Sequence, residues 1–344
     1  MTHFERIHTA MRHEKPDRVP VMCQLSLDFI GRNHGRNINW RNAENVADAF
    51  LNMREMFVFD GVLLDITLPN DWRVDLDLIN AGKKPRRHTG KCEPQEFDRI
   101  DPDKIRLKYD FTNDMGIHEI VAQKSREGDF SVHGEIDSPY DYLIQIFGLQ
   151  DAMMALLLYP EECHAVLEKS VLSAFSFAKA QIDVGVDAMK ISSPYAGGSF
   201  ISREHYSEFV LPYEKEVVSR IHSYKPGIPV YTHTCGFIGD RLELMMATGL
   251  DGIECMDPPP LGDTFLSDAK NRVGDKLFLK GNMDSVNVLL SATTESIEGY
   301  VAEMISDGAY GGGYILSTAC SIAPGVALEI IKLLVLLAKK YGTY

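Results

Sequence analysis

The stretch 229–236, read PVYTHTCG, carries a histidine and a cysteine two positions apart at the end of an apolar run. The run is typical of a buried β-strand, and on an extended chain residues i and i+2 point to the same face. His233 and Cys235 therefore project together, while Thr232 and Thr234 point away. This pair has two interpretations: part of a metal site, or a hydrogen-bonded core histidine beside a small buried thiol.

A third soft ligand, Cys320, follows another apolar run at 314–318. If the strands are parallel and close into a barrel, their carboxyl ends meet at one rim, and His233, Cys235 and Cys320 converge there. Two thiolates and an imidazole are a donor set that suits zinc, and three protein ligands leave a fourth position for substrate. A closed zinc knot usually shows Cys-x2-Cys or His-x3-His spacings, and the chain has neither. The pattern predicts an open zinc site.

The fourth zinc position has competing candidates at the end of the run 249–255. Cys255 is one, and the carboxylates of Glu254 and Asp257 are the others. Spacing alone does not separate them. A carboxylate that holds the fourth position until substrate displaces it would take part in the reaction, so Glu254 and Asp257 are the candidate catalytic residues.

Eight β-rich runs alternate with helical patterns, which predicts an α/β fold of the (β/α)8 TIM-barrel type in one domain, residues 1–344. Several of the runs are continuously apolar, as parallel strands buried on both faces are. The expected strands are Val19–Gln24, Gly61–Ile66, Phe130–Ile136, Ala188–Ser192, Pro229–Cys235, Gly249–Cys255, Lys276–Gly281 and Tyr314–Thr318. The clearest expected helices are Glu161–Val184, Arg203–Tyr224, Ile238–Thr248, Glu295–Asp307 and Val326–Lys340.

The second and third expected strands are separated by a long segment, 67–129, that is rich in Arg, Lys, Asp and Pro. A structureless connection of this length is rare in a compact domain. We therefore expect an inserted cap, such as a small hairpin, over one mouth of the barrel.

Polar side chains follow several of the expected strands and are candidates for substrate binding. The alternative for each is a loop cap or a turn hydrogen bond. They are Gln24, Asp28, Asp65, Asn70, Glu135, Tyr195, Asn282 and Asp284.

Charge and composition restrict the partners. The chain has 49 acidic and 35 basic residues and a formal charge of -14, so the phosphate neutralisation that drives nucleic-acid binding is missing over most of the surface. We expect neither a nucleic-acid nor a membrane partner. The charged start of the chain, MTHFER, does not resemble a secretion signal, and the six cysteines are scattered. These features predict a cytoplasmic protein with reduced thiols.

Four segments together resemble the uroporphyrinogen decarboxylase superfamily over essentially the full chain: DAMKI at 187–191, EFVLPY at 208–213, HTCG at 233–236 and KGNMD at 280–284. Within it, His-x-Cys followed by a distant Cys is similar to the zinc-dependent corrinoid methyltransferases. The resemblance implies zinc held by His233, Cys235 and Cys320 at the rim of a barrel. It also implies transfer of a methyl group between a small substrate, either an aryl methyl ether or a thiol acceptor, and the cobalt of a corrinoid (cobalamin) on a separate partner protein.

Two departures separate the chain from the decarboxylases themselves. Those enzymes carry an arginine-rich Gly-Arg-Tyr segment after the first strand, where this chain reads CQLSLDF at 23–29. Near the eighth strand the decarboxylases have a segment similar to Gly-His-Gly, where this chain has Cys320 between Ala319 and Ser321. A decarboxylase-type lyase is therefore the second hypothesis, and a zinc hydrolase with Glu254 as general base is the third.

Overall fold

The computed structural model describes residues 1–35, 37–66, 95 and 100–344. Within these residues, seven strands form one sheet in chain order, and each is parallel to its neighbours. An all-parallel sheet needs a crossover between successive strands, which is why the runs alternate with helices. The strands are β1 (Gly61–Leu63), β2 (Ser131–Asp137), β3 (Ala188–Ser192), β4 (Val230–Thr234), β5 (Gly252–Cys255), β6 (Phe278–Met283) and β7 (Tyr314–Thr318).

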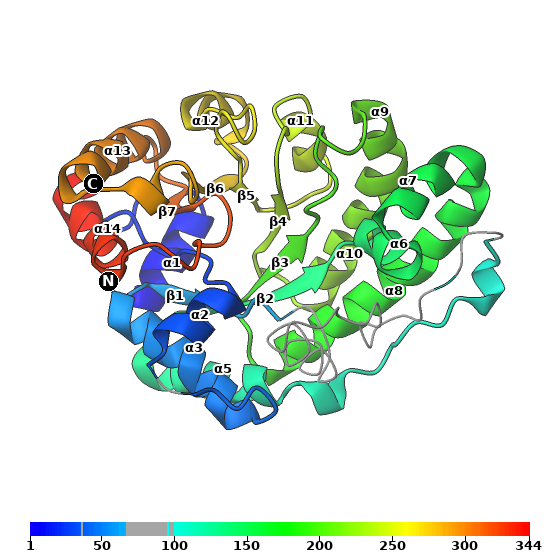
Figure 1. The fold of residues 1–344 in the computed structure, drawn as a ribbon, viewed down its shortest axis with the longest axis horizontal. Coiled ribbons are helices and arrows are strands. Elements are labelled where there is room, and N and C mark those ends of the chain that lie inside the picture. The colour runs from blue at the N-terminus through cyan, green and yellow to red at the C-terminus, as the bar shows by residue number, and fades with distance from the viewer. Residues whose placement is uncertain (36, 67–94, 96–99) are drawn as a thin grey trace.

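Helices lie outside the strands and surround the sheet (Figure 1). The longer ones carry an apolar face that packs inward, as the buried residues of α8, α10 and α14 show. They are α1 (His3–Met11), α2 (Leu27–Asn33), α3 (Ala43–Phe57), α5 (Gly116–Gly128), α6 (Pro139–Phe147), α7 (Leu149–Leu158), α8 (Pro160–Val184), α9 (Arg203–His205), α10 (Leu211–Tyr224), α11 (Leu242–Met246), α12 (Leu266–Val273), α13 (Thr294–Gly308) and α14 (Leu328–Tyr341). Short 3-10 or π turns are η1 (Pro102–Lys104), η2 (Thr112–Asp114), η3 (Tyr206–Val210) and η4 (Leu289–Ser291).

The first expected strand, Val19–Gln24, forms only isolated parallel bridges to β7 and to the residues after it, Val21 with Leu316 and Leu25 with Ile322. On its other side, the Asp60 amide donates to the Val21 carbonyl at 2.9 Å, directly before β1. The segment therefore lies between β7 and β1 without a regular ladder. Pro20 contributes to this irregularity because it has no N–H to donate.

Asp60 anchors this segment at the amino end of β1. Its carboxylate accepts hydrogen bonds from the Arg6 guanidinium at 2.6 Å, from Arg18 at 2.9 Å and from the Val21 amide at 2.8 Å. Asp60 is fully buried. Burial alone would raise its pKa, but His3, Arg18 and the Val21 amide lower it below the ordinary value.

Two expected helices differ from the observed ones. The segment 203–224 is a helix interrupted by the π-helical turn η3, directly before Pro212 at the start of α10. The expected helix 238–248 shortens to α11. Pro160 begins α8 and Ser202 caps α9, where its hydroxyl accepts from the His205 amide at 3.2 Å.

About half of the expected insertion 67–129 lies outside the described residues, which exclude 67–94 and 96–99. Its described end contains α5, a crossover helix before β2 that packs against α3 and α8. Within the described part of the chain, no single helix has the length and apolar composition to cross a membrane. The adjacent helices α6 and α7, bent by 110°, meet those criteria only as a pair.

Candidate metal centre

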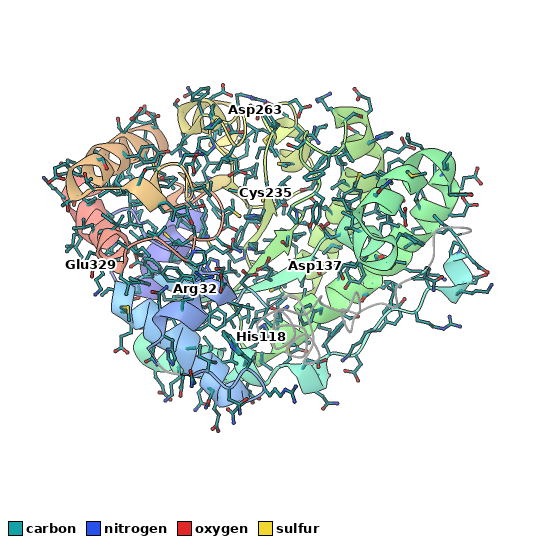
Figure 2. The ribbon with its side chains drawn as sticks, viewed as in Figure 1. Arg32, His118, Asp137, Cys235, Asp263 and Glu329 are labelled. Carbon is teal, nitrogen blue, oxygen red and sulfur yellow. The ribbon has the colours of Figure 1, made fainter. Side chains whose placement is uncertain are left out.

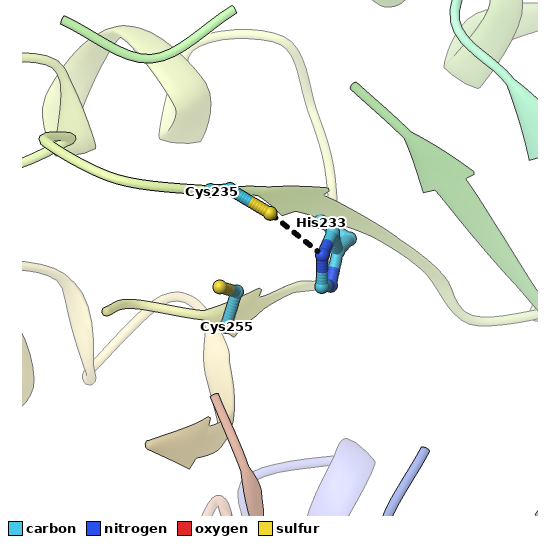
Figure 3. Close-up of side chains that lie close together, drawn as sticks. All are labelled: His233, Cys235 and Cys255. Atoms are coloured by element: carbon cyan, nitrogen blue, oxygen red, sulfur yellow. Dashed lines mark hydrogen bonds between the residues drawn. The ribbon is translucent and has the colours of Figure 1, made fainter. Parts of the chain in front are cut away.

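His233 and Cys235 leave the carboxyl end of β4 on the same side, as the two-residue period requires. The Cys235 Sγ lies 3.3 Å from the His233 Nε2 (Figure 3). The imidazole is buried and the thiol is half-buried. Cys235 lies near the centre of the molecule in Figure 2, with Asp263 above it. A donor pair this close is suited to one metal ion.

Cys320 approaches the same pair from the loop after β7, the last strand of the sheet, whereas the pair follows the middle strand β4. The loop after β7 is held to β6 by the Ala319 amide, which donates to the Met283 carbonyl at 2.7 Å. Hydrogen bonding to Cys235 and burial raise the pKa of the Cys320 thiol, although its contact with His233 acts in the opposite direction. Cys320 therefore contacts the pair, but it is not in the group of three residues, His233, Cys235 and Cys255, whose ligand atoms lie within 4.8 Å of one another in the described part of the chain. Its role as a zinc ligand stays a prediction.

Cys255, at the end of β5, adds a fourth soft donor. One ligand atom from each of His233, Cys235 and Cys255 lies within 4.8 Å of the others. In Figure 3 the Cys255 side chain comes from the strand next to that of the other two. Burial raises the pKa of the Cys255 thiol to about 12.

The donor set fits zinc. Zn–S bonds of about 2.3 Å and Zn–N bonds of about 2.0 Å in a tetrahedron imply ligand-to-ligand distances of roughly 3.5 to 3.8 Å. The observed 3.3 Å between the Cys235 sulfur and the His233 nitrogen requires only a small adjustment. Thiolates and imidazole are soft to borderline donors, which favours zinc over magnesium or calcium.

Glu254 contacts the imidazole from the side opposite to Cys235. It pairs with His233 in the β4–β5 register, and the His233 Nδ1 lies 3.2 Å from the Glu254 Oε2. A carboxylate on Nδ1 holds the Nδ1–H tautomer and leaves Nε2 free for a metal. Glu254 thus contacts the candidate ligand His233. It is not among the three residues, His233, Cys235 and Cys255, whose ligand atoms lie within 4.8 Å of one another.

Two buried lysines surround Glu254. Lys280 Nζ donates to one carboxylate oxygen, and Lys190 Nζ lies 3.6 Å from the other. Both lysines are completely buried. Burial alone would raise the pKa of Glu254, but Lys280, Lys190 and His233 hold it well below the ordinary value. Glu254 is therefore ionised, and it compensates cations that water does not reach.

Asp257 supports the loop that carries Cys235. Its Oδ2 accepts a hydrogen bond from the Gly236 amide at 2.7 Å, and the side chain is buried. Gly236 has a positive φ of 76°, which a residue without a Cβ adopts freely. This contact fixes the turn directly after Cys235.

Three of the predicted substrate-binding residues form a second polar group. The Gln24 amide donates to Asp65 at 3.1 Å, and Lys190 Nζ lies 3.1 Å from the Glu135 Oε1. Burial raises the pKa of Glu135 well above the ordinary value although Lys190 lowers it, and Asp65 raises it further. The Glu135 Oε2 and the Gln24 Oε1 are buried and have no hydrogen-bond partner among residues 1–35, 37–66, 95 and 100–344. Such atoms are suited to bind a polar group of a substrate.

The other predicted substrate-binding residues are separate from this group. Asn282 donates to the carbonyls of Met256 and Thr264 at 3.0 and 3.1 Å. Asp284 caps the turn after β6, where it accepts from the Val286 and Asn287 amides. Asp28 is exposed and pairs with Arg32 at 3.2 Å, Tyr195 lines a cavity of about 330 Å³ with Asp137, and Asn70 lies outside the described residues.

Lys190 and Lys280 were missed as site residues in the sequence-based prediction. The available signal was a lysine inside an apolar run, in AMKI at 188–191 and in LFLKG at 277–281. A charge in a strand that is buried on both faces requires an ionic partner. Glu135 and Glu254 on the neighbouring strands meet that requirement.

Comparison with known proteins agrees with this architecture. The uroporphyrinogen decarboxylase (URO-D) family profile matches residues 2–341. A uroporphyrinogen decarboxylase from Pseudoalteromonas translucida is 30% identical over 306 residues, which cover 84% of this chain and 81% of that protein. Methylcobamide:CoM methyltransferase MtbA from Methanosarcina mazei is 24% identical over 349 residues, which cover 98% and 97%.

Solved structures show the same fold. A methyltransferase from Methanosarcina mazei superposes with a TM-score of 0.81 at 20% identity and covers 99% of both chains. A B12-independent methionine synthase from Shewanella sp. W3-18-1 has a TM-score of 0.55 at 11% identity, with 95% of this chain and 94% of that chain covered. The profile match over nearly the whole length confirms the resemblance found in the sequence: the chain belongs to the uroporphyrinogen decarboxylase family.

Proposed function

We propose that this protein is a zinc-dependent methyltransferase that moves a methyl group between a small substrate and the cobalt of a corrinoid on a separate protein. The observation that carries the proposal is the convergence of His233, Cys235 and Cys320 at one rim of the sheet. A soft donor set of this kind serves zinc chemistry. The similarity to MtbA, a methylcobamide:CoM methyltransferase, also supports methyl transfer as the activity of this protein.

His233, Cys235 and Cys320 would hold the zinc ion. When bound, zinc supplies Lewis acidity, which keeps a substrate thiol ionised as a nucleophile or stabilises the oxygen that leaves a methyl ether. Glu254 keeps the His233 Nδ1 protonated and the imidazole oriented, so that Nε2 faces the donor cluster. Lys190 and Lys280 in turn hold the Glu254 carboxylate in its ionised form.

The polar group of Gln24, Asp65 and Glu135 would bind the substrate. Its unpaired oxygens lie inside the molecule, where a hydrogen bond to a ligand gains most because water does not compete. Glu254 and Asp257, which the sequence offered as candidate catalytic residues, are positioning residues in this proposal. In this proposal Glu254 acts through His233, and Asp257 acts through the turn that carries Cys235.

The corrinoid would be bound by a partner protein that docks over the rim. We further propose that segment 19–24 closes the seven-stranded sheet into a complete (β/α)8 barrel in one domain, and that 67–129 adds a cap to it. The hydrogen bonds of Pro20 and Met22 with Leu316 of β7 on one side, and of Val21 with Asp60 on the other, support this closure.

A decarboxylase-type lyase is the second candidate, because several of the relatives are uroporphyrinogen decarboxylases. Metal content separates the two activities. The methyltransferase should retain about one equivalent of zinc that is lost in His233→Ala and Cys320→Ala, whereas the lyase reaction should proceed equally in the presence of a chelator.

The decisive assay has two arms, each with the protein and zinc. In one, a reduced corrinoid protein receives a methyl group from methoxyaromatics or methylamines, and in the other, a methylated corrinoid protein gives its methyl group to thiols. Methyl transfer changes the cobalt absorbance between its reduced and methylated forms. Cys163→Ser is the matched control, because Cys163 is a buried free cysteine on helix α8, whereas the candidate ligands lie at the carboxyl ends of strands β4 and β7. Activity that persists in metal-free protein would refute the proposal.

A further inference from the structure

Cys255 is a fully buried thiol that lies among the candidate zinc ligands. One ligand atom from each of Cys255, Cys235 and His233 lies within 4.8 Å of the other two. Cys235 is the common neighbour, because it contacts both Cys255 and Cys320. Cys255 is therefore a soft donor in addition to the three, His233, Cys235 and Cys320, that an open three-ligand site requires.

The backbone of Cys255 is left-handed, which a cysteine rarely adopts. Its φ is 79°, and that of the next residue, Met256, is 56°. Glycine would adopt the same conformation without the steric cost that a side chain carries. Non-glycine residues held in this region are found preferentially at functional sites, where the surrounding structure compensates for the strain.

The same left-handed turn explains the direction of the Cys255 side chain. Glu254, one residue earlier on β5, points toward Lys280 and His233. On a regular strand the next side chain would point to the opposite face, away from these groups. Because the chain turns at Cys255, the thiol instead lies beside Cys235 (Figure 3).

The neighbouring ligands are held more firmly. Glu254 fixes the imidazole of His233, and Asp257 fixes the turn after Cys235 through the Gly236 amide. Among the described residues, the Cys255 side chain makes no hydrogen bond to a carboxylate or to a turn amide. Cys255 thus combines a strained backbone with neither of the supports that hold His233 and Cys235.

We propose that Cys255 is a fourth protein ligand of the zinc ion in the substrate-free enzyme and is the ligand that an incoming substrate thiol replaces. The inference rests on the proposed function, because it requires zinc at His233, Cys235 and Cys320. In this exchange the zinc–sulfur bond of Cys255 breaks as that of the substrate forms, and the proton of the substrate thiol passes to the released Cys255 sulfur. The site is then closed at rest and opened by substrate, with no vacant position for water before substrate arrives.

Zinc X-ray absorption tests the number of sulfur ligands directly. Wild-type protein loaded with zinc should show three sulfurs and one nitrogen, and Cys255→Ser should show two sulfurs. Cys255→Gly is a second variant that removes the thiol and relieves the positive φ, so it should fold even if the serine variant does not. Cys163→Ser, which alters another buried cysteine, should retain three sulfurs.

The cobalt-substituted protein gives an independent reading, because thiolate-to-cobalt absorbance increases with each thiolate ligand. Loss of Cys255 should lower this absorbance by about one third, that is, from three thiolates to two. Added mercaptoethanol should leave the sulfur count of the wild type at three, because one thiolate replaces another. It should raise the count of both Cys255 variants from two to three.

A wild-type count of two sulfurs would overturn the inference and leave the proposed function intact. A count that rises to four with mercaptoethanol would show that Cys255 binds zinc but is not displaced, which overturns the exchange. Wild-type protein that retains no zinc would instead refute the proposed function together with the inference.

Discussion

Glu254→Gln is the perturbation that most directly tests the buried charge network. The substitution keeps the size of the side chain and removes its negative charge. Lys190 retains Glu135 at 3.1 Å, but Lys280, which is completely buried, loses its carboxylate partner. Removing one member of a buried ion pair costs about 3 to 5 kcal/mol, because an uncompensated charge stays inside the protein. We expect a loss of this size in the free energy of unfolding of the metal-free protein.

The same variant should weaken zinc binding. A carboxylate on the far nitrogen of a ligating histidine contributes roughly 10- to 100-fold to metal affinity. Glutamine at this position can still accept a hydrogen bond from the His233 Nδ1, which is 3.2 Å from the carboxylate in the structure, so the decrease should lie toward the lower end. Urea unfolding measures the first effect, and competition with a chromogenic chelator measures the second.

Two further variants make this test specific. Glu243→Gln removes a carboxylate that pairs with Arg272 at 2.8 Å on the surface, and it should cost about 1 kcal/mol or less. The double variant Glu254→Gln with Lys280→Met removes both charges and should regain most of the lost stability. Two results together would refute the roles of Glu254 as charge partner of Lys280 and as hydrogen-bond partner of His233. They are a decrease of less than about 1 kcal/mol in the free energy of unfolding of Glu254→Gln, and an unchanged zinc affinity.

Three other predictions follow from the pKa shifts and the ion pairs. Burial raises the pKa of Cys255 to about 12, and the pKa of Cys320 is also raised, so both thiols are protonated at neutral pH without metal. Zinc binding must release at least these two protons, so zinc affinity should rise by at least about 100-fold per pH unit, as chelator competition between pH 6 and 8 would measure. Burial raises the pKa of Glu214 to about 7 in the folded protein, whereas in the unfolded chain its carboxyl ionises near its ordinary pKa. The free energy of unfolding should therefore fall as the pH rises toward 7. Glu214→Gln should recover up to roughly 3 kcal/mol of it at pH 8, as measured by urea unfolding. Asp60→Asn should lower the unfolding free energy by about 3 kcal/mol by urea denaturation, since the guanidinium groups of Arg6 and Arg18 lose a buried partner; an unchanged midpoint would contradict this role.

Most of the sheet was predictable because parallel strands buried on both faces leave continuous apolar runs in the sequence. β3 and β7 match their expected bounds at both ends. The segment at 19–24 has the same apolar character but forms only bridges, because pairing depends on the backbone of its two neighbours and not on composition. The continuity of the helices was less predictable. A π-helical turn at 206–210, for example, interrupts the helix expected over 203–224.

The polar residues after the strands illustrate the same limit. Gln24, Asp65 and Glu135 come from three separate segments, and only their adjacency around the sheet makes them one group. Asp28 and Asp284 have similar positions relative to their strands, yet one lies on the surface beside Arg32 and the other caps a turn. The direction of a side chain in a loop depends on the loop conformation, which spacing does not encode.

Local geometry by itself determined that His233 and Cys235 share a face, because side chains on an extended chain repeat every two residues. The approach of Cys320 depends on the curvature of the whole sheet, since it comes from a strand 80 residues later in the chain. The direction of Cys255 was decided only in the folded protein, where a left-handed turn overrides the alternation of the strand. Short-range periodicity is written in the sequence, whereas contacts between distant strands and the strain that packing stabilises exist only in the tertiary structure.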